Sequence, residues 1–286
     1  MIDTPADVTP EIETALDRLG LRARRLVLVS PLARNKGRRC AYRLEADDGR
    51  TLKVRQLDTA EQARHLVELR AGLEEAFAPV LARYGCVLLE EWIEGIQLTE
   101  LDAEARAADA GALLGRLHAR ALGPDAPATL RTRTWVERAM SDLEILAGAQ
   151  KLGSREVAAL RAEIVRHDPG AVRACLVHMD FCAENMLIDA GGQLRVIDNE
   201  LLAIAPAGFD LGRTFDRWPM SAAAWGRFRR GYRSSAAAEV EAIGFWKILA
   251  ALMGARVRFQ RAPARLDAAL ALLRRFIEGE GLSDPS

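Results

Sequence analysis

The stretch LVHMDFCAENMLID, residues 176–189, concentrates polar side chains directly after an apolar run. Two kinds of chemistry would use such a cluster. In the first, four side chains ligate a metal ion, namely His178, Asp180, Cys182 and Glu184. In the second, only Asp180 and Asn185 act on a substrate, and the other residues hold the loop in place. The rest of the sequence has to distinguish a metal centre from a catalytic loop.

A metal centre needs imidazole or thiolate ligands that converge on one point. The chain has four histidines and four cysteines, and none of them forms a CxxC or HxH pair. His178 is therefore better interpreted as a residue that fixes the loop by hydrogen bonding, and Cys182 as a small apolar group. A metal hydrolase is the weaker hypothesis.

A second acidic motif follows the loop at a spacing typical of phosphoryl transfer. Asp198 and Glu200 end the run QLRVIDNE, which comes after a hairpin signal at AGGQ. In phosphoryl transfer an Asp orients the acceptor hydroxyl, while an Asn and a second Asp hold Mg²⁺ against the phosphates. The required order is present as His178, Asp180, Asn185 and Asp198. If VIDNE is extended, Asp198 and Glu200 point to the same side and can both meet the metal.

Phosphoryl transfer also needs a cation for the phosphates of the nucleotide. The run TLKVRQL supplies Lys53 and Arg55, which share one face of an expected strand. Lys53 is favoured and Arg55 is the alternative. An acid on the following helix would hold the lysine extended, and Glu68 near the helix middle is favoured over Glu61 near its start.

These residues must be positioned by strands in the first third of the chain. About five strands are expected from the runs at residues 22–32, 40–57 and 78–93. Residues 58–77 have helical spacing of apolar side chains and predict one helix between the third and fourth strands. The first third is therefore predicted to be an antiparallel sheet with one packed helix.

Beyond Gly95 the apolar spacing is helical as far as residue 280, apart from short strand-like runs within 174–199. We therefore predict an α+β chain of two lobes, with residues 1–95 forming the sheet lobe and residues 96–286 a mostly helical lobe. The basic, aromatic run WGRFRRGYR at 225–233 is interpreted as an amphipathic helix.

Composition excludes several partners. Forty basic and forty acidic residues cancel, so the positive field that recruits nucleic acid is missing. No apolar run reaches the roughly 18 to 20 residues of a membrane span, and the N-terminal residues are acidic. We expect a cytoplasmic protein with reduced thiols that binds neither nucleic acid nor a membrane.

Six motifs, in this order and spacing, resemble those of the aminoglycoside phosphotransferase and choline kinase family, small-molecule kinases with a protein-kinase-like fold. They are LKV at 52–54, LLEEWIEG at 88–95, LLGRLHA at 113–119, HMDFCAEN at 178–185, VIDNE at 196–200 and FDLGR at 209–213. The resemblance covers nearly the whole chain.

The resemblance implies a role for each matching residue. Asp180 would accept or orient the proton of the substrate hydroxyl, and Asn185 and Asp198 would bind Mg²⁺. LLEEWIEG would be the hinge, where backbone groups near Glu91 and Ile93 hydrogen-bond adenine. The Asp of FDLGR, residue 210, would brace the catalytic loop.

Three positions depart from the family pattern. Met179 stands where the family usually has the glycine of His-Gly-Asp, and Asn199 replaces an aromatic residue between the two acids. The phosphate-covering turn at 30–40 has one glycine, Gly37, so Lys36 or Arg38 would assist.

The sequence thus predicts an ATP- and Mg²⁺-dependent kinase that phosphorylates a hydroxyl group of a small molecule. Aminoglycosides, sugars, amino alcohols and amino acids stay open as acceptors. The near balance of acids and bases past Gly95 disfavours a polycation, and several tryptophans are available to cage a choline-like cation. The alternative is a non-catalytic kinase-like protein that binds a nucleotide or a partner. The choice between ATP and GTP, and the oligomeric state, stay open.

Overall fold

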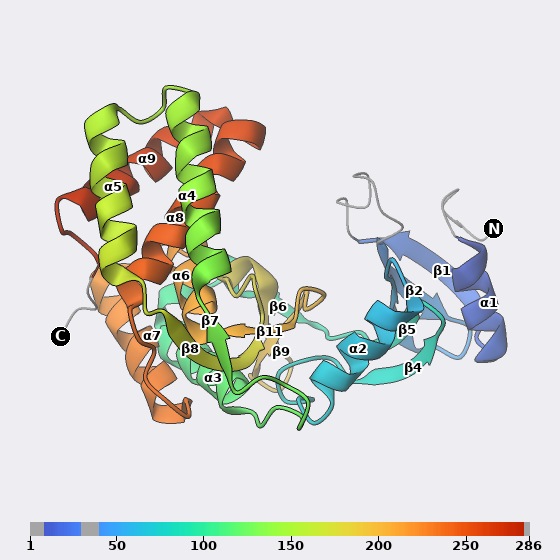
Figure 1. Cartoon of the computed structure of the whole chain (residues 1–286). Coiled ribbons are helices and arrows are strands. Elements are labelled where there is room, and N and C mark those ends of the chain that lie inside the picture. The colour runs from blue at the N-terminus through green and yellow to red at the C-terminus, as the bar shows by residue number, and fades with distance from the viewer. Residues whose placement is uncertain (1–8, 30–39, 283–286) are drawn as a thin grey trace. The chain divides into compact units, whose positions relative to one another are not determined.

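The structure is a computed structural model that describes residues 9–29 and 40–282. The predicted phosphate-covering turn, with Lys36, Gly37 and Arg38, lies outside the described residues. The chain forms two compact units: unit 1 contains Met1–Ile96 and Leu187–Glu200, and unit 2 contains Gln97–Met186 and Leu201–Ser286. The predicted fold class, an antiparallel N-terminal sheet followed by a mostly helical region, is confirmed (Figure 1). Residues 187–200 pack with the sheet, whereas the sequence boundary had assigned them to the second lobe.

Unit 1 is built on a five-stranded antiparallel sheet with strand order β1-β2-β3-β5-β4. The strands are β1 (Ala23–Leu28), β2 (Cys40–Ala46), β3 (Thr51–Gln56), β4 (Val80–Tyr84) and β5 (Val87–Glu91). Leu52 and Val54 of β3 are buried in a core that helix α1 (Pro10–Arg18) completes on the same face. Because side chains alternate along a strand, Lys53 and Arg55 lie on the opposite face.

Helix α2 (Ala60–Arg70) follows β3, and the side chain of its N-cap residue, Thr59, accepts a hydrogen bond from the amide of Gln62. The helix is shorter than the predicted 58–77, because the chain turns at Gly72 with a φ of 76°. Leu66 and Leu69 are buried. The helix therefore packs on unit 1 as its apolar spacing predicts.

The predicted hairpin at residues 186–196 is present as β9 (Met186–Asp189) and β10 (Leu194–Val196), and β6 (Gly95–Gln97) pairs with β9. A Cβ on Gly95 would lie 2.4 Å from the carbonyl oxygen of Ile188, so this strand approach requires glycine. The amide of Val196 donates to the carbonyl of Ala76 at 2.8 Å. This contact ties the end of β10 to the segment after α2.

Unit 2 consists mainly of helices around a small sheet, β11-β8-β7. The helices are α3 (Ala107–Ala119), α4 (Arg133–Gly148), α5 (Ser154–His167), α6 (Ala207–Arg217), α7 (Ala222–Ser235), α8 (Ile243–Arg261) and α9 (Leu266–Ile277). The strands are β7 (Thr129–Arg131), β8 (Ala171–Val177) and β11 (Ala203–Pro206), and the short 3-10 turns are η2 (Leu98–Glu100), η3 (Ala103–Arg106), η4 (Ala183–Asn185) and η5 (Pro263–Arg265).

The core of unit 2 forms around α8, which packs against α4, α6 and α9 (Figure 1). Helix α7 packs closely along α3, because Gly111 lets the two backbones approach: a Cβ there would lie 2.0 Å from the carbonyl oxygen of Phe228. The predicted amphipathic helix is confirmed as α7, which buries Trp225, Phe228 and Tyr232. Within residues 9–29 and 40–282, no helix combines the length and the apolar character needed to cross a bilayer.

Candidate active site

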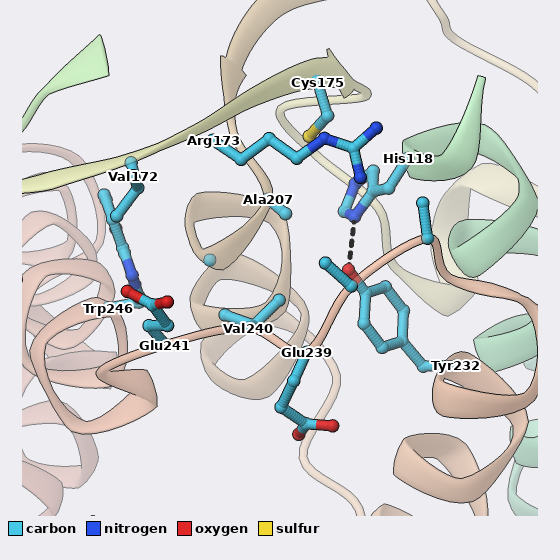
Figure 2. A pocket seen from close by; sticks show the side chains of 13 residues that line it. His118, Val172, Arg173, Cys175, Ala207, Tyr232, Glu239, Val240, Glu241 and Trp246 are labelled. Atoms are coloured by element: carbon cyan, nitrogen blue, oxygen red, sulfur yellow. Dashed lines mark hydrogen bonds between the residues drawn. The ribbon is translucent and has the colours of Figure 1, made fainter. Parts of the chain in front are cut away.

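The loop from His178 to Asn185 begins where β8 ends and closes in the turn η4. The backbone amides of His178 and Met179 both donate to the carboxylate of Asp210, at 2.6 and 2.7 Å. Asp210 is fully buried near the start of α6, and His118 Nε2 lies 3.1 Å from the same carboxylate. Figure 2 shows the next link, the 3.0 Å contact between His118 Nδ1 and the Tyr232 hydroxyl. A buried chain of hydrogen bonds thus holds the first two residues of the loop, and His118 is a buried member of that chain.

Met179 has a left-handed backbone, with a φ of 71°. Glycine adopts this conformation without the steric penalty that a side chain brings, which explains why a glycine suits this position in the His-Gly-Asp pattern. Here a methionine accepts the strain, and its half-buried side chain packs against a small core that contains Cys175 and Val177. The bond from its amide to Asp210 and this packing together hold the conformation.

The carboxylate of Asp180 is held by arginines from α6. Arg213 Nη2 lies 3.0 Å from Asp180 Oδ1, and Arg217 Nη2 lies 3.7 Å from Oδ2. Thr214 adds a 2.7 Å hydrogen bond from its hydroxyl to the carbonyl of Phe181.

The sequence motifs assign no role to the three helical residues that hold the loop. They are Arg213, Thr214 and Arg217, which follow Asp210 at intervals of three, four and seven residues. Residues at these intervals share one face of a helix, so the spacing from Asp210 was the available signal.

Asn185 is fixed within the same loop. Its Nδ2 donates to the backbone carbonyl of Asp180 at 2.9 Å, which leaves the amide oxygen as the atom that can ligand a cation. Cys182 is buried, and burial raises the pKa of its thiol to about 11, so the thiol is neutral. Glu184 is exposed and pairs with Arg217 at 2.6 Å.

In unit 1, Lys53 lies directly opposite Glu90 in the β3–β5 pair. Glu90 is fully buried; Arg55 Nε lies 3.1 Å from its Oε2, and the guanidinium of Arg70 also pairs with it. Burial acts to raise the pKa of Glu90, but the charges of Arg55, Arg70 and Lys53 outweigh it and hold the pKa at about 2. Glu90 is ionised at neutral pH.

The expectation that Glu68 holds Lys53 is not met by this geometry. Glu68 is exposed on α2 and pairs with Arg64 one turn earlier, at 3.1 Å. Arg70 is the residue of α2 that reaches the buried carboxylate. Helical spacing located the helix correctly but not the side of it that faces the sheet.

Burial lowers the pKa of Lys53 to about 8, and the positive charge of Arg55 also lowers it. The negative charges of Glu90 and Asp198 raise the pKa of Lys53 and offset part of this shift. Arg55 itself is 2% exposed and is also bound to Asn199, at 2.9 Å. Lys53 is half-buried. Of the two candidate cations on β3, Lys53 is the one that solvent can reach.

The prediction that VIDNE is extended through Asp198 is wrong, because Asp198 has a left-handed φ of 58° and β10 already ends at Val196. Simple strand alternation therefore does not place Asp198 and Glu200 on one side. Asp198 is exposed, Asn199 is buried and Glu200 is half-buried.

The donors at these positions fit Mg²⁺, which prefers carboxylate and amide oxygens. Within the described part of the chain, no three His, Cys, Asp and Glu side chains are grouped as a metal cluster. The candidate ligands comprise two carboxylates, Asp198 and Glu200, and the amide oxygen of Asn185.

The predicted hinge starts at the end of β5. The amide of Glu91 donates to the carbonyl of Pro79 at 3.0 Å, so this N–H is engaged within unit 1. The side chain of Glu91 is exposed and Ile93 is half-buried. The carbonyl of Glu91 and the backbone of Ile93 are the candidate hydrogen-bonding groups for a nucleotide base.

A cavity of about 100 Å³ lies within unit 2 beside the His118–Tyr232 bond (Figure 2). Its lining includes Arg173, Gly208 and Trp246. Gly208 lies in the first turn of α6, whereas the arginines that contact Asp180 lie in the later turns of that helix. The cavity is therefore separate from the loop at 178–185.

Several solved structures share this fold at low sequence identity. Choline kinase LicA from Streptococcus pneumoniae is 14% identical with a TM-score of 0.64, over 92% of this chain and 97% of that one, and it has also been solved in complex with AMP. A thermostable mutant of aminoglycoside phosphotransferase APH(4)-Ia is 16% identical with a TM-score of 0.64, over 94% and 99%. Macrolide 2'-phosphotransferase MphH from Brachybacterium faecium is 15% identical with a TM-score of 0.58, over 93% and 98%.

No curated protein sequence matches the chain. The family model described as phosphotransferase enzyme family matches residues 29–246, well over half of the chain. The matched range contains Lys53, the loop at 178–185 and Asp210. Because the match spans strands β2 to β5 of the sheet and the loop that α6 holds, the chain belongs to the phosphotransferase enzyme family.

Proposed function

We propose that the protein is an ATP- and Mg²⁺-dependent kinase that phosphorylates a hydroxyl group of a small molecule. The observation that carries the proposal is the geometry of Asp180, whose carboxylate is held by Arg213 while Asn185 binds its backbone carbonyl. A carboxylate fixed in this way is suited to accept a proton from an acceptor hydroxyl. The neighbour LicA, with its AMP complex, supports a nucleotide as the other substrate.

Unit 1 supplies the groups for the nucleotide. Lys53 binds the phosphates, and the charge of Glu90 opposite it favours the ammonium form. The backbone near Glu91 and Ile93 contacts the adenine ring. Asp198, Glu200 and Asn185 are the proposed ligands of Mg²⁺, which would neutralise charge on the phosphates.

Unit 2 supplies the group for the acceptor. Asp180 takes the hydroxyl proton as the acceptor oxygen bonds to the terminal phosphorus, and the bond from that phosphorus to the bridging oxygen breaks to release ADP. Arg213 keeps the carboxylate in place. Catalysis is then mainly a matter of positioning and charge neutralisation.

The charges near Asp180 favour an acceptor that is not a polycation. Arg213 and Arg217 both lie against its carboxylate, and each would repel an amino sugar that carries several positive charges. A sugar, an amino alcohol or an amino acid is therefore proposed over an aminoglycoside.

Three tryptophans of unit 2, Trp218, Trp225 and Trp246, do not favour a choline-like acceptor. The ring of Trp225 lies 5.5 Å from Lys247 Nζ, and that of Phe215 lies 4.7 Å away, so these rings already hold a cation of the chain itself. Trp218 and Trp246 are at most 6% exposed, in the core.

The test is ADP release by the full chain with Mg²⁺-ATP and a library of hydroxylated metabolites and antibiotics. An acceptor should raise the rate, and Asp180→Asn should lower it by about 10² to 10⁴-fold. Glu184→Gln is the control, because Glu184 is exposed in the same loop and should change the rate by less than about threefold.

Turnover that survives Asp180→Asn would refute the mechanism. Nucleotide binding without Mg²⁺ and without any turnover would favour the non-catalytic alternative. Highest activity on aminoglycosides would overturn the proposed acceptor class.

A further inference from the structure

Arg55 and Asn199 are 144 positions apart in the sequence, yet they form a buried hydrogen bond in unit 1. Arg55 Nη1 donates to Asn199 Oδ1 at 2.9 Å, and each residue is 2% exposed. We propose that this pair positions the segment 198–200 so that Asp198 and Glu200 bind a divalent cation. The inference rests on the proposed function, because the cation is the Mg²⁺ of that function.

The donor is rigidly held. Arg55 lies on β3, and its Nε is 3.1 Å from Glu90 on the neighbouring strand β5. Glu90 is in turn paired with Arg70 of α2. Because residues of two strands and a helix fix the guanidinium, its Nη1 is held in one orientation as the donor to Asn199.

The segment that Asn199 belongs to needs such an anchor. Asp198 has a φ of 58°, a conformation that costs free energy in a residue other than glycine and persists only when its surroundings impose it. Two residues before it, Val196 is bound to the carbonyl of Ala76. One residue after it, Asn199 is bound to Arg55. These anchors on both sides fix the turn that leaves Asp198 exposed.

The pair also accounts for a departure from the family pattern. An aromatic residue between the two acids would pack without accepting a hydrogen bond, and Arg55 would keep its ion pair with Glu90 but lose the acceptor of its Nη1. Asn199 supplies that acceptor. Asparagine at 199 and arginine at 55 are therefore matched to one another, and both are positioning residues that need not touch the substrates.

The experiment measures divalent cation binding directly. Mn²⁺ is titrated by electron paramagnetic resonance into the full chain with a non-hydrolysable ATP analogue. Asn199→Leu, which removes the acceptor at similar volume, should weaken Mn²⁺ binding by about 10 to 100-fold. Asn199→Asp keeps an acceptor oxygen for Arg55 and should bind Mn²⁺ within about threefold of the parent.

Gln56→Leu is the matched control. Gln56 is the next residue of β3 and is fully buried, but it lies on the other face of the strand and binds Thr9. Its loss should leave Mn²⁺ binding within about threefold of the parent. Arg55→Lys is a second test variant, because a lysine lacks the guanidinium fork that reaches Glu90 and Asn199 together, and it should weaken binding as Asn199→Leu does.

If a folded Asn199→Leu or Arg55→Lys variant binds Mn²⁺ with the affinity of the parent, the inference is wrong. The proposed function stands in that case as long as the parent turns over ATP. Equal weakening in Gln56→Leu overturns the inference as well, since the effect would then be general destabilisation. A parent chain that binds no Mn²⁺ with the nucleotide analogue overturns both the inference and the proposed function.

Discussion

Lys53 and Glu90 lie opposite each other on two antiparallel strands. The carboxylate of Glu90 interacts with three cations, Lys53, Arg55 and Arg70. Arg55 and Arg70 contact Glu90 directly, whereas Lys53 interacts with it through its field. Because the guanidinium groups satisfy most of the carboxylate, the positive charge of Lys53 is only partly compensated. A cation of this kind can attract the phosphates of a nucleotide.

The lowered pKa of Lys53 predicts that nucleotide binding depends on pH. Burial and the charges of Arg55 and Arg70 lower this pKa, while the charges of Glu90 and Asp198 raise it, and the result is a pKa of about 8. The ammonium is therefore charged below pH 8 and loses its proton above it. ATP phosphates favour the charged form. Binding at pH 8.5 should therefore take up a proton, and ATP affinity should fall as the pH rises further.

Calorimetric titrations in two buffers of different ionisation enthalpy measure this proton uptake. Lys53→Arg should abolish it, because arginine stays protonated throughout this pH range. An unchanged uptake in Lys53→Arg would assign the proton to another group.

Glu90→Gln should destabilise the fold. It removes the only buried carboxylate that contacts Arg55 and Arg70 within the described residues, and breaking such a buried pair costs about 3 to 5 kcal/mol. The pKa of Glu90 is lowered from 4.5 to about 2, so its contribution to stability is complete above pH 4.5 and is lost as the pH falls toward 2.

Thermal and urea unfolding of the full chain measure the effect of Glu90→Gln. Glu68→Gln is the control, because its ion pair with Arg64 is exposed and should be worth less than about 1 kcal/mol. Similar losses in both variants would contradict the buried role of Glu90.

Arg213→Met should lower kcat without a comparable change in KM for ATP. Arg213 holds Asp180, the group proposed to receive the acceptor proton, and a loosened carboxylate should cost about 10-fold or more in kcat. Steady-state kinetics separate the two constants. Arg133→Met is the control: it removes an exposed arginine paired with Glu137 and should change neither kcat nor KM. If Arg213→Met raised the KM for ATP by more than it lowered kcat, Arg213 would instead have a nucleotide-binding role.

Met179 should tolerate glycine better than a β-branched residue. Met179→Gly loses half-buried packing but relieves the left-handed backbone, so stability should stay within about 1 kcal/mol of the parent. Met179→Val keeps the strain and adds a branched Cβ, and should destabilise by about 1 to 3 kcal/mol. Unfolding midpoints compare the two, and a valine variant as stable as the glycine variant would show that the backbone strain is small.

Local sequence patterns were enough to predict the order of the elements and the loop. Alternating apolar residues predict the strands, helical spacing predicts α2 and α7, and the interval from Asp180 to Asn185 predicts the loop chemistry. These patterns work because each depends on residues that are neighbours in the chain. Asp210 was identified differently, through the resemblance of FDLGR at 209–213 to a motif of the family.

Tertiary structure alone decided which charges meet. Glu90 lies opposite Lys53 because of the register between β3 and β5, and no local pattern fixes that register. Arg70 rather than Glu68 faces the sheet because packing sets the rotation of α2. Arg55 is buried against Asn199, and the backbone of Asp198 turns left-handed, because a distant hairpin packs beside the sheet. The sequence by itself determined the chemical groups and their order, while long-range packing determined their partners, exposure and charge.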